Sequence, residues 1–444
     1  MTSLPSNVVL LSFEGPDPYS MVGGLGTRVT EMSAALARAG VKTTLVFVGD
    51  PDAAPVEQPA PNLELRRWSQ WISASHRADV YDGELEKMND YTESVPGFVI
   101  RSVVEPAAVH GEQVLVIAED WQTAPSIIAL EAKLRESGFR DRVTLTWNAN
   151  NTYGFHTIPW RELAEAVRIT TVSRYMKFEL QARGVDPLVI PNGIPERLLE
   201  GAPKRLARDA VKRFRDRRPL FVKVARFDED KRWMQVVDAF ADIVARYPEA
   251  TLVMRGGREE YGLEVARHAR ERGLHVEDLT IGSRDPQDVL EAIASAPGSV
   301  VNVKSFIPEE TLYTLYHVAD AVLANSGREP FGLVGLEVMA VGGVVITGST
   351  GEDYVESFEN ALVCDTGDPR ELRGLLEEVI ANHERAHSMA AAGEATAQRY
   401  AWPRVLELLA RKLGITSLSA PAAVAPDPPS RGPLRLVQGR ASVP

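Results

Sequence analysis

Short runs rich in Val, Ile, Leu and Thr recur along the chain, and longer segments with helical periodicity separate them. Each run is apolar on both faces, as in parallel strands that helices cover on either side of a sheet. A strand–helix unit repeated in this way predicts doubly wound α/β sheets. Twelve strands are expected, at residues 7–14, 42–49, 113–120, 142–149, 168–173, 187–193, 219–227, 250–257, 299–306, 321–326, 343–349 and 361–366.

The strands fall into two sets, because a polar and basic stretch at 197–219 interrupts the pattern. A chain of 444 residues also exceeds what one ordinary core holds. We therefore expect two Rossmann-like domains that face each other across a cleft, at 1–200 and 201–400. Residues 417–444 are rich in Pro, Ala and Ser without apolar periodicity, which predicts a disordered tail.

Composition narrows the class of protein. The net charge of −12 argues against a nucleic-acid binder, although a local basic cluster can still bind an anionic substrate. Cys364 is the single cysteine, so no intramolecular disulfide can form and a reducing compartment is expected. The first residues lack a basic signal-peptide region, and no apolar run is long enough to span a membrane. These observations predict a soluble cytoplasmic protein.

The stretch NSGREPFGLVGLEVMA, residues 325–340, places two carboxylates near one end of an expected strand. Glu329 would lie at the mouth of a ligand site and accept a sugar hydroxyl. Glu337 would lie two turns inside the following helix, where a buried carboxylate can accept both hydroxyls of a ribose. Alternatively, Glu329 is a charge at the N-terminus of the helix dipole and Glu337 belongs to a solvated face.

The same helix is expected to open at Pro330 and Phe331, because proline suits a first helical turn. The free N–H groups of Gly332, Leu333 and Val334 would then point outward and form a phosphate cradle.

Two further segments follow expected strands. Arg226, and Lys231 five residues later, can converge on a diphosphate, one as a planar fork and the other as a point charge. The alternative is an exposed loop whose cations pair with the acidic residues between them. Near the N-terminus, Gly23, Gly24 and Gly26 precede the first expected helix, where glycine lets the backbone approach a ligand and frees N–H donors.

Taken together, these segments resemble the retaining glycosyltransferases of the GT-B fold, above all the bacterial glycogen and starch synthases. The motifs that carry the resemblance are PYSMVGGLG, AEDWQTA, WNANNTYGF, TVSRYMK, ARFDEDK and REPFGLVGLE, and they cover roughly residues 8 to 412 in order. The last is similar to the Glu-x7-Glu motif of that family.

The resemblance implies an acceptor domain at 1–200, a donor domain at 201–400 and a helix at 401–416 that returns to the first domain. The donor is a nucleotide sugar whose diphosphate Arg226 and Lys231 would hold. Glu337 would bind the ribose and Glu329 the sugar, while the glycine loop closes over the site and Asp120 borders the reacting centre. The residues from Phe331 to Leu333 would line the donor site. No metal and no cofactor are implied.

Two positions depart from the family pattern. Trp147 stands where the family has an active-site histidine, followed by the retained Asn148, and Gln122 replaces the histidine of the Asp-Trp-His segment. A tryptophan there suggests stacking on the face of a sugar, and so an acceptor or sugar contact at Trp147 and Asn148.

Two other patterns were weighed. HERAH, residues 383–387, matches His-Glu-x-x-His, the zinc-binding pattern of metalloproteases. Such short matches arise by chance, so a solvated helix is favoured over a zinc site. Residues 63–77 interleave arginine and tryptophan, which suits contact with a glycan acceptor or an anionic membrane surface; because the basic residues are few, an acceptor-side insert is favoured over the membrane. Alternatively, the segment is an insert that packs its tryptophans on the N-terminal domain.

The sequence thus predicts a glycogen-synthase-like hexosyltransferase, with glucose as the expected sugar and a glycan or small molecule as acceptor. The alternatives are a non-catalytic nucleotide-sugar or glycan-binding protein, and another GT-B enzyme such as a nucleotide-sugar epimerase.

Overall fold

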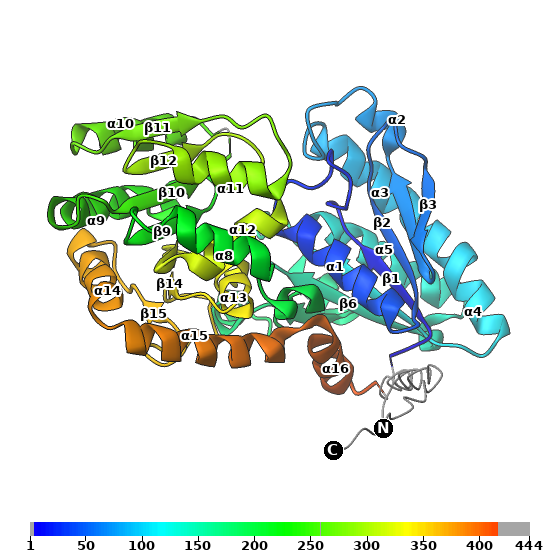
Figure 1. The fold of residues 1–444 in the computed structure, drawn as a ribbon. Helices are drawn as coiled ribbons and strands as arrows, with labels where there is room; N and C mark the ends of the chain where they lie inside the picture. The colour runs from blue at the N-terminus through cyan, green and yellow to red at the C-terminus, as the bar shows by residue number, and fades with distance from the viewer. Residues whose placement is uncertain (1–3, 258, 416–444) are drawn as a thin grey trace, which may run out of the picture.

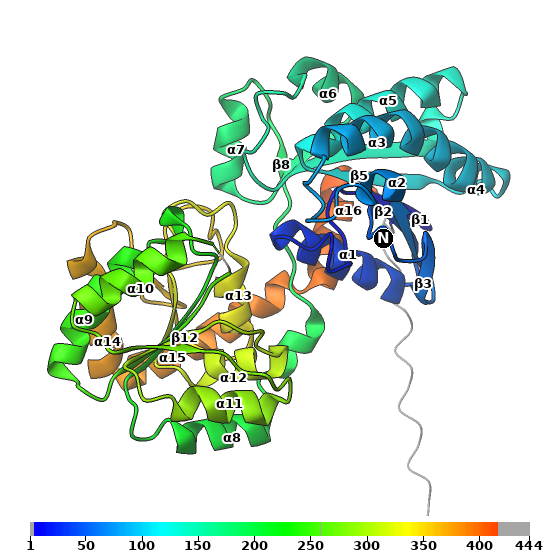
Figure 2. The same cartoon turned by 90° about the horizontal axis from the view of Figure 1, so that it is seen from above.

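The computed structural model describes residues 4–257 and 259–415, which form two α/β domains (Figures 1 and 2). All twelve expected strands are present, and the predicted fold of two doubly wound sheets is confirmed. The tail predicted at 417–444 lies outside the described residues.

The first sheet has eight strands in the order β3-β4-β2-β1-β5-β6-β7-β8. They pair in parallel except for β3, which runs antiparallel to β4. The strands are β1 Asn7–Leu11, β2 Lys42–Val48, β3 Val56–Ala60, β4 Leu63–Trp68, β5 Val114–Glu119, β6 Val143–Ala149, β7 Arg168–Thr171 and β8 Leu188–Val189.

Helices cover both faces of this sheet because its central strands are apolar on both sides. In β1, Val8 and Leu10 face a core shared with α1 and α16, whereas Val9 and Leu11 face the core under α3 and α5. The helices of this part are α1 Gly24–Arg38, α2 Gln70–Ser73, α3 Glu84–Val99, α4 Glu105–Val109, α5 Ala124–Glu136, α6 Trp160–Ala166 and α7 Arg174–Gln181.

The second sheet has seven parallel strands in the order β11-β12-β10-β9-β13-β14-β15. They are β9 Leu220–Val224, β10 Thr251–Arg255, β11 Val276–Leu279, β12 Val300–Val303, β13 Ala321–Ala324, β14 Val345–Thr347 and β15 Leu362–Val363. Alternate residues of β9 again serve two cores: Phe221 packs under α9, α10 and α14, and Val222 packs under α8, α11 and α12.

The helices of the second half complete the fold, and α16 crosses back to the first domain (Figure 1). Trp402 at the start of α16 is 1% exposed and packs among residues of α1 and the first sheet. These helices are α8 Lys204–Arg213, α9 Trp233–Arg246, α10 Tyr261–Glu271, α11 Pro286–Ser295, α12 Glu309–Val318, α13 Leu333–Ala340, α14 Pro369–Ala381, α15 His383–Ala397 and α16 Trp402–Leu413.

Three strands, β3, β4 and β11, were not predicted. The segment expected to be an acceptor-side insert contains β4, which pairs in parallel with β2. Its two arginines interrupt the apolar pattern by which the other strands were recognised. Trp68, the last residue of β4, packs on Phe98, while Trp71 in α2 is 72% exposed. Among the described residues, no helix combines the length and the apolar character needed to cross a membrane.

Candidate active site

The loop that follows β9 brings the predicted phosphate-binding cations to the carboxyl edge of the second sheet. Arg226 lies just after the strand and its side chain is exposed. The short turn Glu229–Lys231, capped by the Asp228 carboxylate, directs Lys231 toward the loop before α13. The Lys231 ammonium lies 2.5 Å from a carboxylate oxygen of Glu329, and the two side chains are 18% and 21% exposed. Two distant loops therefore meet in an ion pair that solvent and ligands can reach.

The backbone of Glu329 is fixed from both sides. Its N–H donates to the Thr350 hydroxyl at 2.8 Å, and that hydroxyl lies 3.2 Å from the Glu329 carbonyl, to which it can donate in turn. Two residues later, Phe331 is 2% exposed and packs against Tyr354 and Tyr400. Its ring anchors the loop and offers no surface to a donor, in contrast to the contact predicted for it.

Helix α13 begins at Leu333, later than the predicted start at Pro330, because Gly332 adopts the left-handed conformation with φ +79°. A Cβ atom at Gly332 would lie only 2.8 Å from Cγ of Glu352 and 3.3 Å from Cγ of Glu329. Glycine is therefore required here for its conformation and for space. The helix N-terminus, with Leu333 partly buried, still lies next to Glu329, where its free N–H groups favour an anion.

Glu337 lies further along α13 and is partly buried. Burial raises its pKa to about 7, the nearby Glu309 raises it too, and Arg197 opposes both. Among the residues that the structure describes, none forms a hydrogen bond or ion pair with its carboxyl group. It is thus a carboxyl group whose hydrogen-bonding capacity is available to a ligand.

The glycine loop between β1 and α1 is already bonded within the chain. The Gly23 and Gly26 N–H groups both donate to one Glu14 carboxylate oxygen at 2.9 Å. Glu14 is 4% exposed, and its charge suits the positive end of α1. The donors predicted to be free at Gly23 and Gly26 are therefore occupied, whereas Gly24 is exposed and faces open space.

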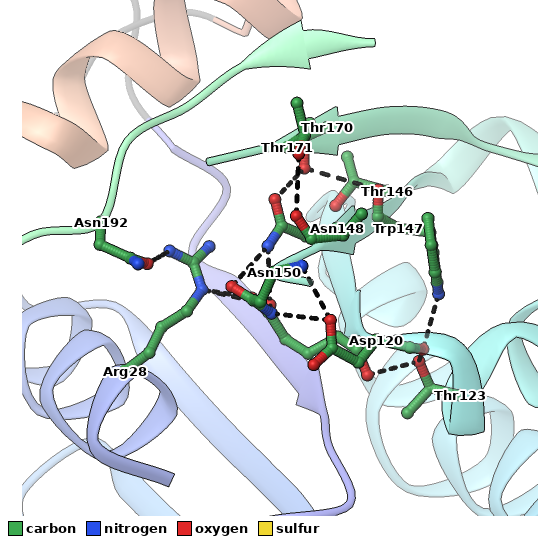
Figure 3. A network of polar contacts seen from close by, with 12 residues as sticks. Arg28, Asp120, Thr123, Thr146, Trp147, Asn148, Asn150, Thr170, Thr171 and Asn192 are labelled. Atoms are coloured by element: carbon green, nitrogen blue, oxygen red, sulfur yellow. Dashed lines mark hydrogen bonds and ion pairs between the residues drawn. The ribbon is translucent and has the colours of Figure 1, made fainter. Parts of the chain in front are cut away.

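Asp120 lies directly after β5 and is 4% exposed, with a left-handed φ of +62° (Figure 3). Its carboxylate accepts the Asn150 N–H at 2.8 Å and the Asn151 side-chain amide at 2.9 Å. Burial raises the pKa of Asp120 to about 7; the Asn150 hydrogen bonds lower it, and the neighbouring Glu119 adds to the rise. The group is thus held at the carboxyl edge of the first sheet, directly after β5.

Behind Asp120 lies a buried ion pair that the sequence analysis did not single out. Arg28 Nε is 3.1 Å from both Glu119 carboxylate oxygens, and the two side chains are 4% and 0% exposed. Asn148 and Asn150 donate to the same carboxylate at 2.9 and 2.7 Å (Figure 3). Asn148 therefore belongs to a buried scaffold and does not reach a ligand directly.

Trp147 has no exposed surface, so its ring cannot stack on a sugar as predicted. Its indole N–H donates to the Asp120 carbonyl at 2.9 Å, and its ring meets Trp160 edge-on with centroids 5.9 Å apart. In place of the family's histidine, the chain thus has a packing residue that supports the backbone of Asp120. The replacement of the other histidine, Gln122, is also buried and donates to Glu84 at 3.0 Å.

The two domains touch beside Glu329. The Ser173 hydroxyl, after β7, donates to the Pro330 carbonyl at 2.6 Å. Arg174 binds Asp353 through its backbone N–H at 2.7 Å and its guanidinium at 3.0 Å. The loop that carries Glu329 is therefore in contact with both sheets.

The residues missed from sequence had weak signals. Glu119 lies in the AEDWQTA motif, but as the last residue of an apolar run it gave no sign of a buried ion pair, and Glu14 only precedes the glycine loop. The HERAH histidines, His383 and His387, are exposed on α15. Within the described ranges, no group of three or more metal-ligating side chains is placed to hold a metal ion.

Residues 205–396 match the family model described as glycosyl transferases group 1, a range that includes Arg226, Lys231, Glu329 and Glu337. The second domain is a group 1 glycosyltransferase domain.

Curated relatives of this chain align over part of their length. A D-inositol 3-phosphate glycosyltransferase of Corynebacterium urealyticum is 28% identical over 39% of this chain and 38% of its own. An uncharacterized glycosyltransferase of Methanocaldococcus jannaschii is 33% identical over 28% of this chain and 34% of its own. The chain thus spans little more than a third of the length of these relatives.

Solved structures match both domains of this chain together. Sucrose-phosphate synthase of Thermosynechococcus elongatus is 20% identical, with a TM-score of 0.66 over 92% of this chain and 98% of its own. Anabaena HepE in complex with UDP and glucose is 15% identical, with a TM-score of 0.60 over 92% of this chain and 99% of its own. The shared fold is GT-B.

Proposed function

We propose that this protein is a glycosyltransferase that transfers a sugar, with glucose as the first candidate, from a nucleotide-sugar donor to a glycan or small-molecule acceptor. The reaction retains the anomeric configuration and needs no metal ion. The observation that carries the proposal is the accessible Lys231–Glu329 ion pair, with the exposed Arg226 five residues before Lys231 in the same loop. It provides one cation for a diphosphate and one carboxylate for a sugar at the same edge of the sheet.

Donor binding would rearrange this pair. An incoming diphosphate competes with Glu329 for the Lys231 ammonium, and Arg226 can bind the same phosphates as a fork. As the glycosidic bond breaks, the two cations stabilise the negative charge that develops on the departing diphosphate. The Glu329 carboxylate, released from Lys231, can then accept a hydrogen bond from a sugar hydroxyl and orient the ring.

The remaining groups fit this arrangement. The carboxyl group of Glu337 is available to accept the ribose hydroxyls, and the exposed Gly24 borders the space into which an acceptor must enter. Retention is proposed because the spacing of Glu329 and Glu337 is that of the retaining enzymes the chain resembles. UDP-glucose is the donor to test first, since Anabaena HepE was solved with UDP and glucose.

A donor panel tests the proposal. UDP-, ADP- and GDP-glucose are incubated with the full chain, with and without a glucan and with and without a chelator, and nucleotide release is recorded. Release from one donor, unaffected by chelator and abolished in K231A, is the expected result. K133A, which removes an exposed lysine of α5, is the matched control and should keep full turnover. Unchanged turnover in K231A would refute the role of the ion pair, and binding without release would favour a non-catalytic protein.

A further inference from the structure

A buried carboxyl group with no role so far lies directly behind Glu329. Glu352, in the loop after β14, is 8% exposed. One of its oxygens accepts the Thr350 N–H at 3.1 Å. The other oxygen is buried and has no hydrogen-bond partner among the described residues. A buried polar atom left without a partner is costly, so its presence next to a ligand site calls for an explanation.

Glu352 is connected to Glu329 in two ways. Thr350 donates its N–H to Glu352, while its hydroxyl bonds the N–H and the carbonyl of Glu329. The two side chains also approach Gly332 together, since a Cβ atom there would lie 2.8 Å from Glu352 Cγ and 3.3 Å from Glu329 Cγ. The position of Glu329 therefore depends on the position and the hydrogen bonding of the Glu352 side chain.

The surroundings favour the neutral form of Glu352. Lys231, whose charge acts on Glu352, is paired with Glu329, and a second carboxylate in this space would repel the first. Burial raises the pKa of Glu352 to about 8, the charge of Glu329 raises it further, and the Thr350 N–H and Lys231 act in the opposite direction.

The other ionisable groups around Glu352 are already engaged. The Tyr354 hydroxyl donates to the Gly332 carbonyl, and burial raises its pKa well above the usual range. From the first domain, Arg174 binds the neighbouring Asp353. Neither group supplies a donor to the unpartnered oxygen of Glu352.

We propose that Glu352 is a positioning residue for the donor: as a neutral acid it holds the backbone of Glu329 through Thr350 and adds no second negative charge beside the Glu329 carboxylate. This inference rests on the proposed function. Ionisation of Glu352 would add a second negative charge next to an anionic donor and would compete with it for Lys231. Donor affinity should therefore fall as the pH rises through the pKa of Glu352.

The charge state is tested by infrared spectroscopy of the full chain without any ligand. The difference spectrum between the wild type and E352Q should show a protonated carboxyl band at pH 6.5 that disappears with a midpoint near pH 8. E356Q removes an exposed carboxyl group of the same loop and should show no such band. A Glu352 that is already ionised at pH 6.5 overturns the proposal.

The positioning role is tested by calorimetric titration with UDP-glucose between pH 6.5 and 9.5. The wild type and E356Q should lose about tenfold in affinity above pH 8, whereas E352Q should bind as the wild type does at pH 6.5 and lose no more than about twofold. An equal loss in E352Q overturns the positioning role alone. If the wild type binds no nucleotide sugar at any pH, the positioning role falls together with the proposed function, while the infrared titration still decides the charge state.

Discussion

The carboxyl edges of the two sheets hold their charged groups in opposite ways. On the second sheet, Arg226 is exposed and the Lys231–Glu329 pair is partly open to solvent. On the first sheet, Arg28 and Glu119 form a pair that is at most 4% exposed and that two asparagines complete. The open pair on the second sheet can exchange partners when a ligand arrives. The buried pair on the first sheet cannot do so without unfolding part of the core.

This difference separates the charged groups that can bind a ligand from those that support the fold. An exposed ion pair contributes little to stability, typically 0–1 kcal/mol, so its groups are free to serve a ligand. A buried pair loses several kcal/mol when one partner is removed, because the other charge is left unpaired. We therefore expect substitutions on the first sheet to affect stability and substitutions on the second to affect turnover.

The largest expected effect is on the buried pair. R28A leaves Glu119 as an unpaired charge and should lower the free energy of unfolding by about 3–5 kcal/mol. Urea denaturation followed by circular dichroism measures this loss. A loss below about 1 kcal/mol, typical of a surface pair, would contradict the assignment of Arg28 to a scaffold.

The pH dependence of Asp120 should be nearly as large. Its pKa is raised from 3.8 to about 7 in the folded protein, so the folded state binds the proton more tightly than the unfolded state. Protonation of Asp120 therefore adds to the free energy of unfolding. This contribution, at most about 4 kcal/mol, is fully present below pH 3.8 and is lost as the pH rises to about 7. D120N does not titrate. The stability of the wild type relative to D120N should therefore fall over this range and stay constant above it, and a flat difference would contradict the raised pKa.

On the second sheet, R226A should reduce donor turnover by about a hundredfold, the loss usual for one group that stabilises transition-state charge. Its stability should stay within about 0.5 kcal/mol of the wild type, since the side chain is exposed. Steady-state kinetics and urea denaturation on the same preparation check both statements. A destabilised R226A with normal turnover per folded molecule would reverse the comparison.

The smallest effect is expected at Trp147. W147F removes the indole hydrogen bond to the Asp120 carbonyl and part of the ring volume, and should cost about 1–2 kcal/mol of stability. Turnover at 25 °C should change by less than about threefold if the residue only packs. A larger loss of turnover, with acceptor affinity reduced, would restore the contact with a sugar that the sequence suggested.

Sequence reasoning succeeded where local chemistry decides the outcome. The apolar strands were recognisable because both their faces are buried, and the approach of Arg226 and Lys231 to one edge follows from their place after a strand. It failed where distant packing decides. The arginines of β4 concealed a strand, and the left-handed Gly332 delayed the start of α13.

Burial was the property least accessible from sequence. Nothing in the motif containing Phe331 indicates that two tyrosines enclose its ring. Likewise, the loop glycines gave no sign that Glu14, nine positions before Gly23, would take their N–H groups. Such contacts depend on which loops lie together at the edge of the sheet, and a single sequence does not show which distant loops are neighbours.

The central claim is that the cations of the second sheet bind the donor while the charged groups of the first sheet support the fold. Calorimetric titration of UDP-glucose into the wild type, K231A and D120N at pH 7 tests it most directly. The claim predicts at least a tenfold loss of affinity in K231A and a change below about twofold in D120N. Unchanged affinity in K231A, with a large loss in D120N, would contradict it.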